Sequence, residues 1–229
     1  MYGLRKNIRF NQKVMQIIKI NLKKIKDSDI QIIADSLKLG QVIVYPTDTV
    51  YGIGCLATNK KAINKVFKIK KIVPPKPLIV LVKSYCMLHD LCCVSKAQER
   101  CIRNVWPPTT RDAQNPKYKY NKQPTTFILK SRGNLPKEII GEGGSLAVRL
   151  PKNDFLMKLI KTINEPLVST SLNITGQPLL THLVNLEKYF KDIKPNLVID
   201  AGEIKKTKPS KIIDIRNINS DGTGTKIIR

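Results

Sequence analysis

The decapeptide at residues 45–54, Tyr-Pro-Thr-Asp-Thr-Val-Tyr-Gly-Ile-Gly, constrains this chain more than any other segment. It lies between a short apolar run and a helix-like stretch at about 59–71. We expect the apolar run to be a strand that leads into a turn fixed by Pro46. Gly52 and Gly54 would permit positive φ or the close approach of a ligand. An ordinary strand-to-helix connection is the alternative, but the density of polar side chains and glycines favours a binding loop on a rigid scaffold.

Size and composition indicate a globular protein of one or two domains, without a linker, low-complexity tract or internal repeat that would require two. The chain has 229 residues, of which 41% are hydrophobic, and this is enough for a sizeable core. No apolar run approaches the roughly 20 residues needed to cross a bilayer, and no cleavable signal follows the basic amino terminus. We therefore expect a cytoplasmic protein without a membrane segment. Residues 1–14 are predicted to be a disordered basic arm or a start-site artefact ahead of Met15, and residues 15–229 to be the folded domain.

The formal net charge of +24 favours anionic partners. Two interpretations remain open: a lysine-rich surface without a specific role, or positive charge that serves as a surface for RNA or as a cleft for a nucleotide. Aromatic residues make up only 6% of the chain and show no base-stacking pattern. This composition disfavours a dedicated single-strand binding protein.

The cysteines do not predict a metal site. There are five of them, an odd number, without paired C-x-x-C spacing, and the chain has only two histidines. Reduced thiols are the expected state in a cytosol, and no metal ligands are predicted. We expect Cys92 and Cys93 to pack on the apolar face of a helix.

Strand-like and helix-like segments alternate along the chain. The predicted strands are 17–20, 41–45, 78–82, 126–130, 146–150, 167–169, 197–199 and 211–215, and the predicted helices are 27–39, 59–71, 96–105, 155–163 and 183–190. This order predicts an α/β fold with a twisted, partly parallel mixed sheet and flanking helices. Ligands of such sheets gather where strands end in loops, so Thr47, Lys70, Ser171 and Ser210 are candidates for one cleft.

Residues 107–124 interrupt this alternation because they are polar, basic and without periodicity. We predict an inserted loop. It could be a lid, an RNA contact or a tolerated surface excursion.

Several segments occur together in an order that is typical of one family. They are Tyr-Pro-Thr-Asp-Thr-Val-Tyr-Gly at 45–52, a lysine-rich helix end at 68–71, Pro-Leu-Ile-Val at 77–80, Trp-Pro at 106–107, Thr-Thr-Phe-Ile-Leu at 125–129, Ala-Val-Arg-Leu-Pro at 147–151, Ser-Thr-Ser-Leu-Asn-Ile-Thr-Gly at 169–176 and Pro-Ser-Lys-Ile-Ile-Asp at 209–214. Over about residues 16–229 the chain resembles the YrdC/TsaC family of threonylcarbamoyl-AMP synthases, in its single-domain form. The resemblance implies a YrdC-like catalytic domain with a concave, positively charged cavity.

The resemblance also implies a reaction. Such a nucleotidyltransferase joins L-threonine, bicarbonate and ATP, with Mg²⁺ accompanying the ATP, and releases pyrophosphate and threonylcarbamoyl-AMP. The product feeds a downstream threonylcarbamoyl transferase complex that modifies an adenosine of tRNA, so tRNA is a further candidate partner. Charge that develops at the α-phosphate would be stabilised by lysines, hydroxyls and backbone N–H groups. The sequence has no Walker P-loop that could hold the nucleotide instead.

The site residues implied by the resemblance fall into three groups. Thr47 and Thr126 would contact threonine; Lys70, Ser171 and Asn173 would be catalytic and hold the nucleotide; Lys76, Arg149 and Ser210 would complete the nucleotide site. The residues alone leave other roles open. A helix-end lysine is favoured by the helix dipole, Ser and Asn can brace a turn, and Arg149 could be a structural ion-pair partner.

Three positions depart from the family pattern. Ile72 stands where the family has an arginine, and a bidentate phosphate clamp is lost with it; Lys71 or Lys76 could supply the charge. Leu81 stands where the family often has histidine, and Lys211 where it has threonine. Three hypotheses follow: an active synthase, a YrdC-like paralogue that binds nucleotide or RNA without synthesis, and a ribosome- or tRNA-associated binding module.

Overall fold

The computed structural model describes residues 15–73, 76–106, 123–174, 176, 180, 182–184, 186–204 and 209–229. The strands are β1 (Gln16–Lys19), β2 (Ile43–Pro46), β3 (Tyr51–Leu56), β4 (Ile79–Leu81), β5 (Cys92–Cys93), β6 (Thr125–Ser131), β7 (Ser145–Arg149), β8 (Leu167–Ser171), β9 (Leu197–Asp200), β10 (Lys211–Asp214) and β11 (Lys226–Ile227). The α-helices are α1 (Asp27–Lys38), α2 (Lys60–Lys70), α3 (Tyr85–Leu91), α4 (Lys96–Arg103), α5 (Asp154–Ile163) and α6 (Leu186–Tyr189). The predicted arm at 1–14 and most of the predicted loop at 107–124 lie outside the described residues.

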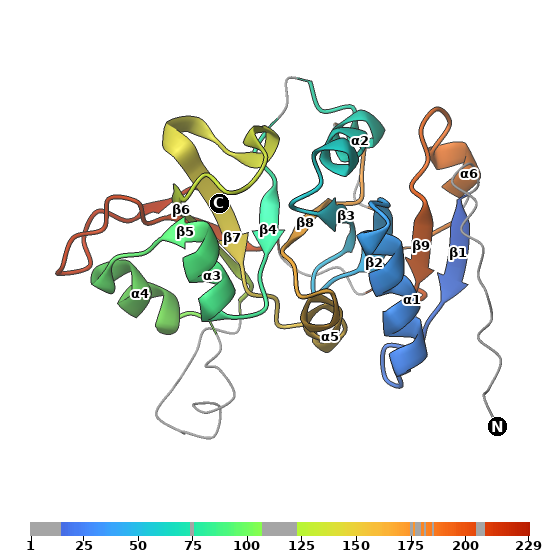
Figure 1. The fold of residues 1–229 in the computed structure, drawn as a ribbon, viewed down its shortest axis with the longest axis horizontal. Helices are drawn as coiled ribbons and strands as arrows, with labels where there is room; N and C mark the ends of the chain where they lie inside the picture. Colours follow the sequence, from blue (N-terminus) through green and yellow to red (C-terminus); the bar gives the residue numbers. More distant parts are fainter. Residues whose placement is uncertain are drawn as a thin grey trace.

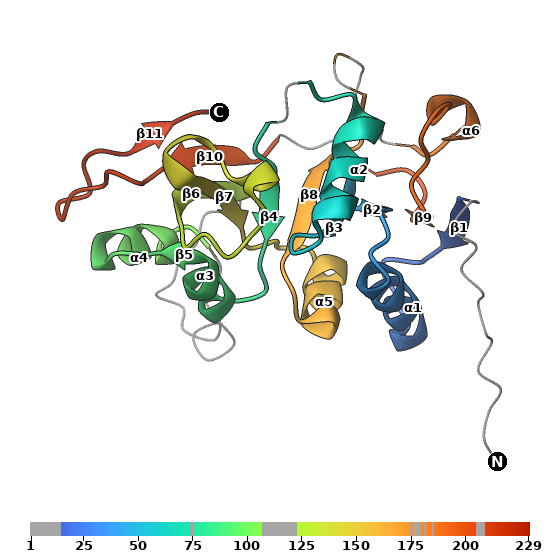
Figure 2. The same cartoon turned by 45° about the horizontal axis from the view of Figure 1, so that its top comes forward.

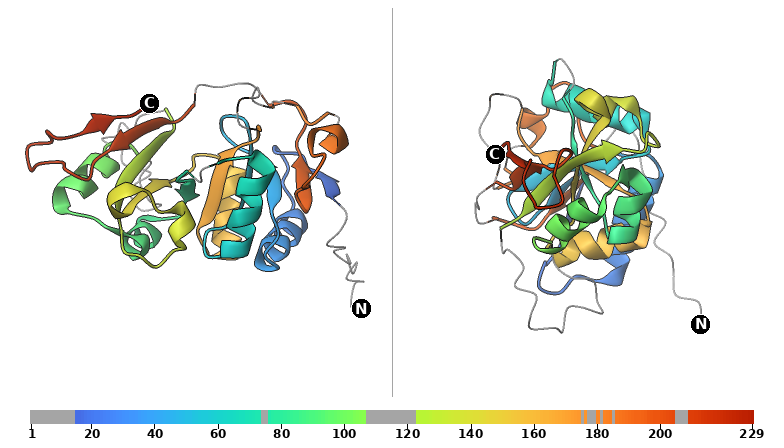
Figure 3. Two further views of the ribbon diagram at one scale, coloured as in Figure 1. Left: turned by 90° about the horizontal axis from the view of Figure 1, so that it is seen from above. Right: turned by 90° about the vertical axis from the view of Figure 1, so that its left-hand side faces the viewer.

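These strands form one mixed sheet in the order β1-β9-β2-β3-β8-β4-β7-β6-β10-β11, with β5 paired to β6. Four neighbouring pairs are parallel: β1 with β9, β2 with β9, β4 with β7, and β6 with β10. The sheet runs from β1 and β9 at one end of the molecule to β10 and β11 at the other (Figures 1 and 3). The predicted α/β fold with a partly parallel mixed sheet is confirmed.

The helices pack their apolar faces against the sheet and against each other. Asn59 caps α2, since its side chain accepts a hydrogen bond from the Ala62 N–H at 3.0 Å, and α2 packs on β3. Helices α1 and α5 pack side by side next to the strands (Figure 2). None of the helices in the described part of the chain has the length and apolar character that a bilayer span requires.

Cys92 and Cys93, which we expected on the apolar face of a helix, lie in a strand. Cys92 and Cys93 form β5, which pairs antiparallel with β6 opposite Ser131 and Lys130. Cys92 is buried and Cys93 is exposed. The prediction of a helix for these two residues was wrong because the helix before them, α3, ends at Leu91, and the chain then follows the edge of the sheet.

The decapeptide forms a β-hairpin, and not the loop between a strand and a helix that its glycines suggested. Residues Tyr51–Leu56 are a strand, β3, that pairs antiparallel with β2 on one side and with β8 on the other. All six of its residues are buried. A strand buried on both faces shows no alternation of polar and apolar residues, and therefore the pattern did not reveal it.

Gly54 serves the packing of this central strand. Its φ is not positive, in contrast to the expectation for Gly52 and Gly54. A Cβ atom at Gly54 would lie 1.8 Å from the carbonyl oxygen of Val168 and 2.9 Å from the Tyr45 hydroxyl. Glycine is required here because β8 and the Tyr45 ring both lie against the backbone of β3.

We predict that Gly54→Ala lowers the free energy of unfolding by at least about 3 kcal/mol, because the added methyl group must push β3 and β8 apart. Gly133→Ala is the control: its φ is +80° and nothing lies within 4 Å of the added carbon, so the cost should be about 1 kcal/mol of backbone strain. Urea unfolding of both variants measures the difference. Equal costs would contradict this account of Gly54.

Candidate functional site

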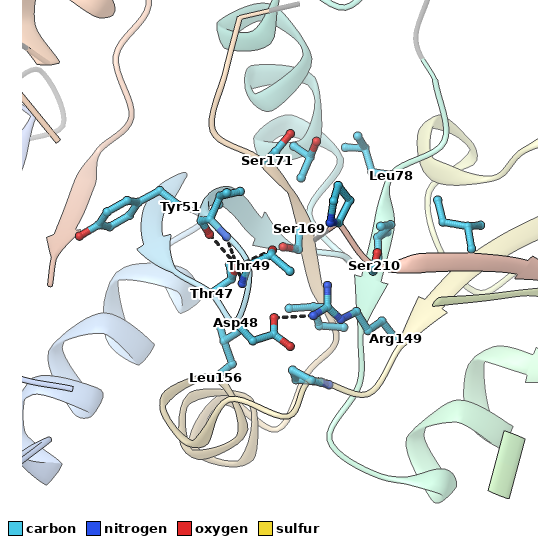
Figure 4. Close-up of a pocket in the computed structure, with 18 of the residues that line it drawn as sticks. Thr47, Asp48, Thr49, Tyr51, Leu78, Arg149, Leu156, Ser169, Ser171 and Ser210 are labelled. Atoms are coloured by element: carbon cyan, nitrogen blue, oxygen red, sulfur yellow. Dashed lines mark hydrogen bonds and ion pairs between the residues drawn. The ribbon is translucent and has the colours of Figure 1, made fainter. Parts of the chain in front are cut away.

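A cavity of about 290 Å³ opens where the β2–β3 hairpin, β8, β4 and the start of β10 meet. Its polar lining comes from the turn at 47–49, from the end of β8 (Ser169, Thr170 and Ser171), and from Arg149, Ser210 and Arg229. Apolar side chains, including Leu78, Leu81 and Leu156, cover the remaining wall. Figure 4 shows these side chains converging from separate elements of the fold. The structure thus brings Thr47, Ser171, Ser210 and Arg149 together, as the sequence suggested.

The hydroxyl of Thr47 stabilises the hairpin turn by hydrogen bonds within it. The Thr47 Oγ1 accepts hydrogen bonds from the backbone N–H groups of Thr49 and Val50 at 3.1 and 3.2 Å, and donates one to the Val50 carbonyl. The hydroxyl of Thr49 lies 3.1 Å from the same oxygen. Because these hydrogen bonds lie within the turn, the Thr47 hydroxyl fixes the shape of the turn and with it the shape of the cavity wall.

Asp48 and Arg149 form an ion pair in the wall of the cavity. The side chains are only 15% and 9% exposed, respectively. The Arg149 Nη2 donates to the Asp48 Oδ1, whereas the Arg149 Nε is buried and has no acceptor among the described residues. The sequence offered Arg149 as a candidate and left open that it could be a structural ion-pair partner, but nothing in it identified Asp48 as that partner.

Lys70 lies behind the cavity and contacts the loop that follows β8. Its ammonium donates hydrogen bonds to the Ser171 carbonyl and, at 3.0 Å, to the Asn173 Oδ1. The Ser171 hydroxyl donates to the same Asn173 oxygen at 2.8 Å. The three residues therefore form one hydrogen-bonded cluster, of which Ser171 reaches the cavity lining.

Burial lowers the pKa of Lys70 to about 8. The side chain is only 5% exposed, and the Ser171 carbonyl and the Asn173 amide oxygen that accept from it are neutral. Removal of the ammonium from water disfavours its charged form. Lys70 is thus a cation that can lose its proton close to neutral pH.

Ser210 and Arg229 form the wall opposite the hairpin turn. The Arg229 Nε donates to the Ser210 carbonyl at 3.3 Å, and the Arg229 Nη2 lies 3.5 Å from the Ser210 hydroxyl. Pairing of the chain end with β10 sets this position, because the Ile212 N–H donates to the Arg229 carbonyl at 2.9 Å. Sequence reasoning missed Arg229, since only the β10–β11 pairing brings it to the cavity.

Thr126 lies beneath Ser210 and is completely buried. Its hydroxyl is 3.3 Å from the Ser210 hydroxyl. It is not among the described residues that line the cavity. Thr126 can therefore orient Ser210, but the structure does not bring it into the cavity.

Neither lysine suggested as a replacement for the missing arginine lines the cavity. Lys71 is exposed and pairs with Asp192 at 3.5 Å, and Lys76 is exposed as well. Ile72 packs against the hydrophobic core. The guanidinium that faces Ser210 is that of Arg229, from a distant part of the chain.

Tyr51 ties the hairpin to the chain segment that precedes Ser210. The Tyr51 hydroxyl accepts from the Ala201 N–H at 2.9 Å and donates to the Gly202 carbonyl at 2.7 Å. Burial raises the pKa of Tyr51 to about 12. Its role is therefore structural: it ties the hairpin to the turn that follows β9.

The fold and the site together define a class of α/β protein. In this class the strand ends of a mixed sheet surround a cavity that is lined by two guanidinium groups and several hydroxyls. The sequence pattern of the Sua5/YciO/YrdC family, which carries the description "Telomere recombination", matches residues 35–229. The chain belongs to this family.

Two curated relatives are threonylcarbamoyl-AMP synthases. The one from Klebsiella pneumoniae is 31% identical over 181 residues, which cover 78% of this chain and 86% of the relative. The one from Pyrococcus abyssi is 28% identical over 198 residues, which cover 86% of this chain and 54% of the relative. The chain therefore spans about half the length of the Pyrococcus protein.

Solved structures agree with the fold. The structure of P. abyssi Sua5 complexed with L-threonine has a TM-score of 0.73 at 25% identity and covers 94% of this chain and 57% of its own. The E. coli YciO structure also has a TM-score of 0.73, covers 94% of both chains and is 22% identical. At that identity YciO supports the fold alone.

We predict that the stability of the wild type rises relative to Lys70→Met as the pH increases from about 8 towards 10.5, the ordinary pKa of lysine. In this window the unfolded chain keeps the Lys70 proton and the folded chain has lost it, so the unfolded state binds more protons and stability increases with pH. Urea unfolding across this range measures the change. Lys68→Met, an exposed lysine of the same helix, is the control. A difference between wild type and Lys70→Met that is constant with pH would contradict the burial of a titrating amine.

Proposed function

We propose that this protein is a threonylcarbamoyl-AMP synthase, a nucleotidyltransferase that joins L-threonine, bicarbonate and ATP with release of pyrophosphate. The observation that carries the proposal is the convergence of Arg149, Ser171, Ser210 and Arg229 on one cavity, with Lys70 behind it. Family membership and the names of the relatives support it. The product would pass to a threonylcarbamoyl transferase complex that acts on tRNA.

The amino-acid end of the cavity would lie at the hairpin turn. Arg149 is a guanidinium in a largely apolar wall with Leu81 and Leu156, and guanidinium groups bind carboxylates well. A small amino acid would place its carboxylate at Arg149 and its side chain near the turn that Thr47 braces. L-threonine is the amino acid bound in the Pyrococcus Sua5 structure, and this supports the assignment.

The nucleotide end would lie between Ser171, Ser210 and Arg229. Two hydroxyls and a guanidinium there could hold the α-phosphate while pyrophosphate leaves. The reaction needs little covalent chemistry from the protein, so positioning and charge stabilisation supply most of the effect. Lys70 would orient Ser171 and Asn173 and add positive charge behind the phosphates.

Mg²⁺ would enter as the complex with ATP. Among the described residues, no group of three or more His, Cys, Asp or Glu side chains could hold a metal ion, and the one acidic residue in the cavity lining, Asp48, is paired with Arg149. Phosphates and water are the usual ligands of Mg²⁺ at such sites. The ion would offset phosphate charge, and the protein would supply the cations and hydroxyls around it.

The direct test is pyrophosphate release from ATP and Mg²⁺ with and without L-threonine and bicarbonate. We expect release that depends on both. No threonine-dependent release, with nucleotide or RNA binding retained, would favour a paralogue or an RNA-associated module that lacks synthase activity.

Lys70→Ala should lower turnover much more than stability; a large fall in the melting temperature with unchanged turnover would make Lys70 structural.

We predict that Arg229→Gln weakens ATP binding by about tenfold or more, because a charge-assisted contact to phosphate contributes on the order of 1.5–3 kcal/mol. Affinity for L-threonine should change little. Calorimetric titration with each ligand measures the two effects. Arg100→Gln, at an exposed arginine that contacts the Ser220 carbonyl, is the matched control. Equal ATP affinity in wild type and Arg229→Gln would remove Arg229 from the nucleotide site.

A further inference from the structure

The amino-acid end of the cavity wall carries two charged side chains, Asp48 and Arg149, and the Lys152 ammonium, which is not among the lining residues, interacts electrostatically with both. Asp48 and Arg149 are paired and largely buried. Burial lowers the pKa of the Lys152 ammonium, with Asp48 acting to raise it and Arg149 to lower it. Lys152 therefore interacts with both members of the pair.

The three charges sum to a single positive charge. Arg149 and Lys152 contribute +1 each and Asp48 contributes −1. The Arg149 Nε has no acceptor among the described residues although it is buried, and a buried donor without a partner points to a missing ligand or water. The Asp48–Arg149 pair and the neighbouring Lys152 together are thus matched in charge to one monoanion.

A guanidinium alone would not select a carboxylate at this position. Arginine binds phosphate and carboxylate with the same donor geometry. Under the proposed function, ATP and pyrophosphate occupy the same cavity and carry several negative charges each. Once one negative charge has neutralised this end of the cavity, a further negative charge on the same ligand would be buried without a compensating cation and repelled by Asp48, which is a means of excluding a wrong ligand.

We propose that Asp48 is a selectivity and positioning residue: it holds Arg149 in the wall and cancels one of two positive charges, so that this end of the cavity takes a carboxylate and excludes phosphate. The proposal deepens the function proposed above and rests on it. Neither the family description nor the names of the relatives assign a role to Asp48. Figure 4 shows Asp48 and Arg149 pointing toward one another between the hairpin turn and Ser210.

The test compares ligand binding, without turnover, in the full chain. L-threonine is titrated by calorimetry in the absence and presence of inorganic phosphate, with wild type, Asp48→Asn, Asp48→Glu and Asp48→Asn/Lys152→Gln. For Asp48→Asn we expect about tenfold weaker threonine binding, because a buried charge pair is broken, and competition by phosphate at concentrations that leave the wild type unaffected. Asp48→Glu keeps the charge and should still exclude phosphate.

The double variant separates charge from position. It restores the single positive charge, so phosphate should be excluded again, but threonine should stay weakly bound because Arg149 is no longer held. Asp192→Asn, which removes a carboxylate from the exposed pair with Lys71, is the control and should match the wild type. If Asp48→Asn does not fold, Lys152→Gln replaces it: this end of the cavity then becomes neutral, and threonine binding should weaken.

The outcomes separate the two proposals. A wild type that binds no L-threonine overturns the proposed amino-acid site and this inference with it. A wild type that binds L-threonine, with Asp48→Asn of equal affinity and equal indifference to phosphate, overturns the inference alone. If Asp48→Asn does not fold, unchanged threonine affinity in Lys152→Gln does the same.

Discussion

The close contact between β3 and β8 is the constraint on which the site depends. Gly54 lets the backbone of Val168 approach β3, and the resulting register places Gly52 opposite Ser171. The Leu172 N–H then donates to the Tyr51 carbonyl at 2.7 Å. These contacts fix the hairpin turn and the loop after β8 as neighbouring walls of one cavity, although more than a hundred residues separate them in the chain.

Two of the cations at or behind the cavity are largely buried, and removing a cation from water costs free energy. Lys70 and Arg149 are both largely buried, and their described contacts differ: the Lys70 ammonium donates to two neutral oxygens, whereas a carboxylate faces the Arg149 guanidinium. A buried ammonium removed from water holds its proton less tightly, and a guanidinium offers a fixed fork of donors to a carboxylate. The two cations are therefore suited to different tasks under the proposed function: Lys70 to adding positive charge behind the phosphates, and Arg149 to binding a carboxylate.

The sequence predicted the parts of the structure that depend on local patterns. The periodic helices, the strand pairs of mixed direction and the convergence of Thr47, Ser171 and Ser210 all follow from residue order and from the rule that ligands lie at strand ends. It did not predict β3, since a strand buried on both sides shows no alternation, nor the two-residue strand β5. The Asp48–Arg149 pair and the position of Arg229 depend on contacts between distant segments, and no local pattern contains that information.

The pairing of the last strand has a practical consequence for handling the protein. The residue at the cavity rim, Arg229, is also the carboxyl-terminal residue of the sequence given, and its carbonyl accepts a hydrogen bond from β10. Any residues joined after Arg229, such as a purification tag, would begin beside the cavity lining, where bulk or charge can mimic a defect in binding.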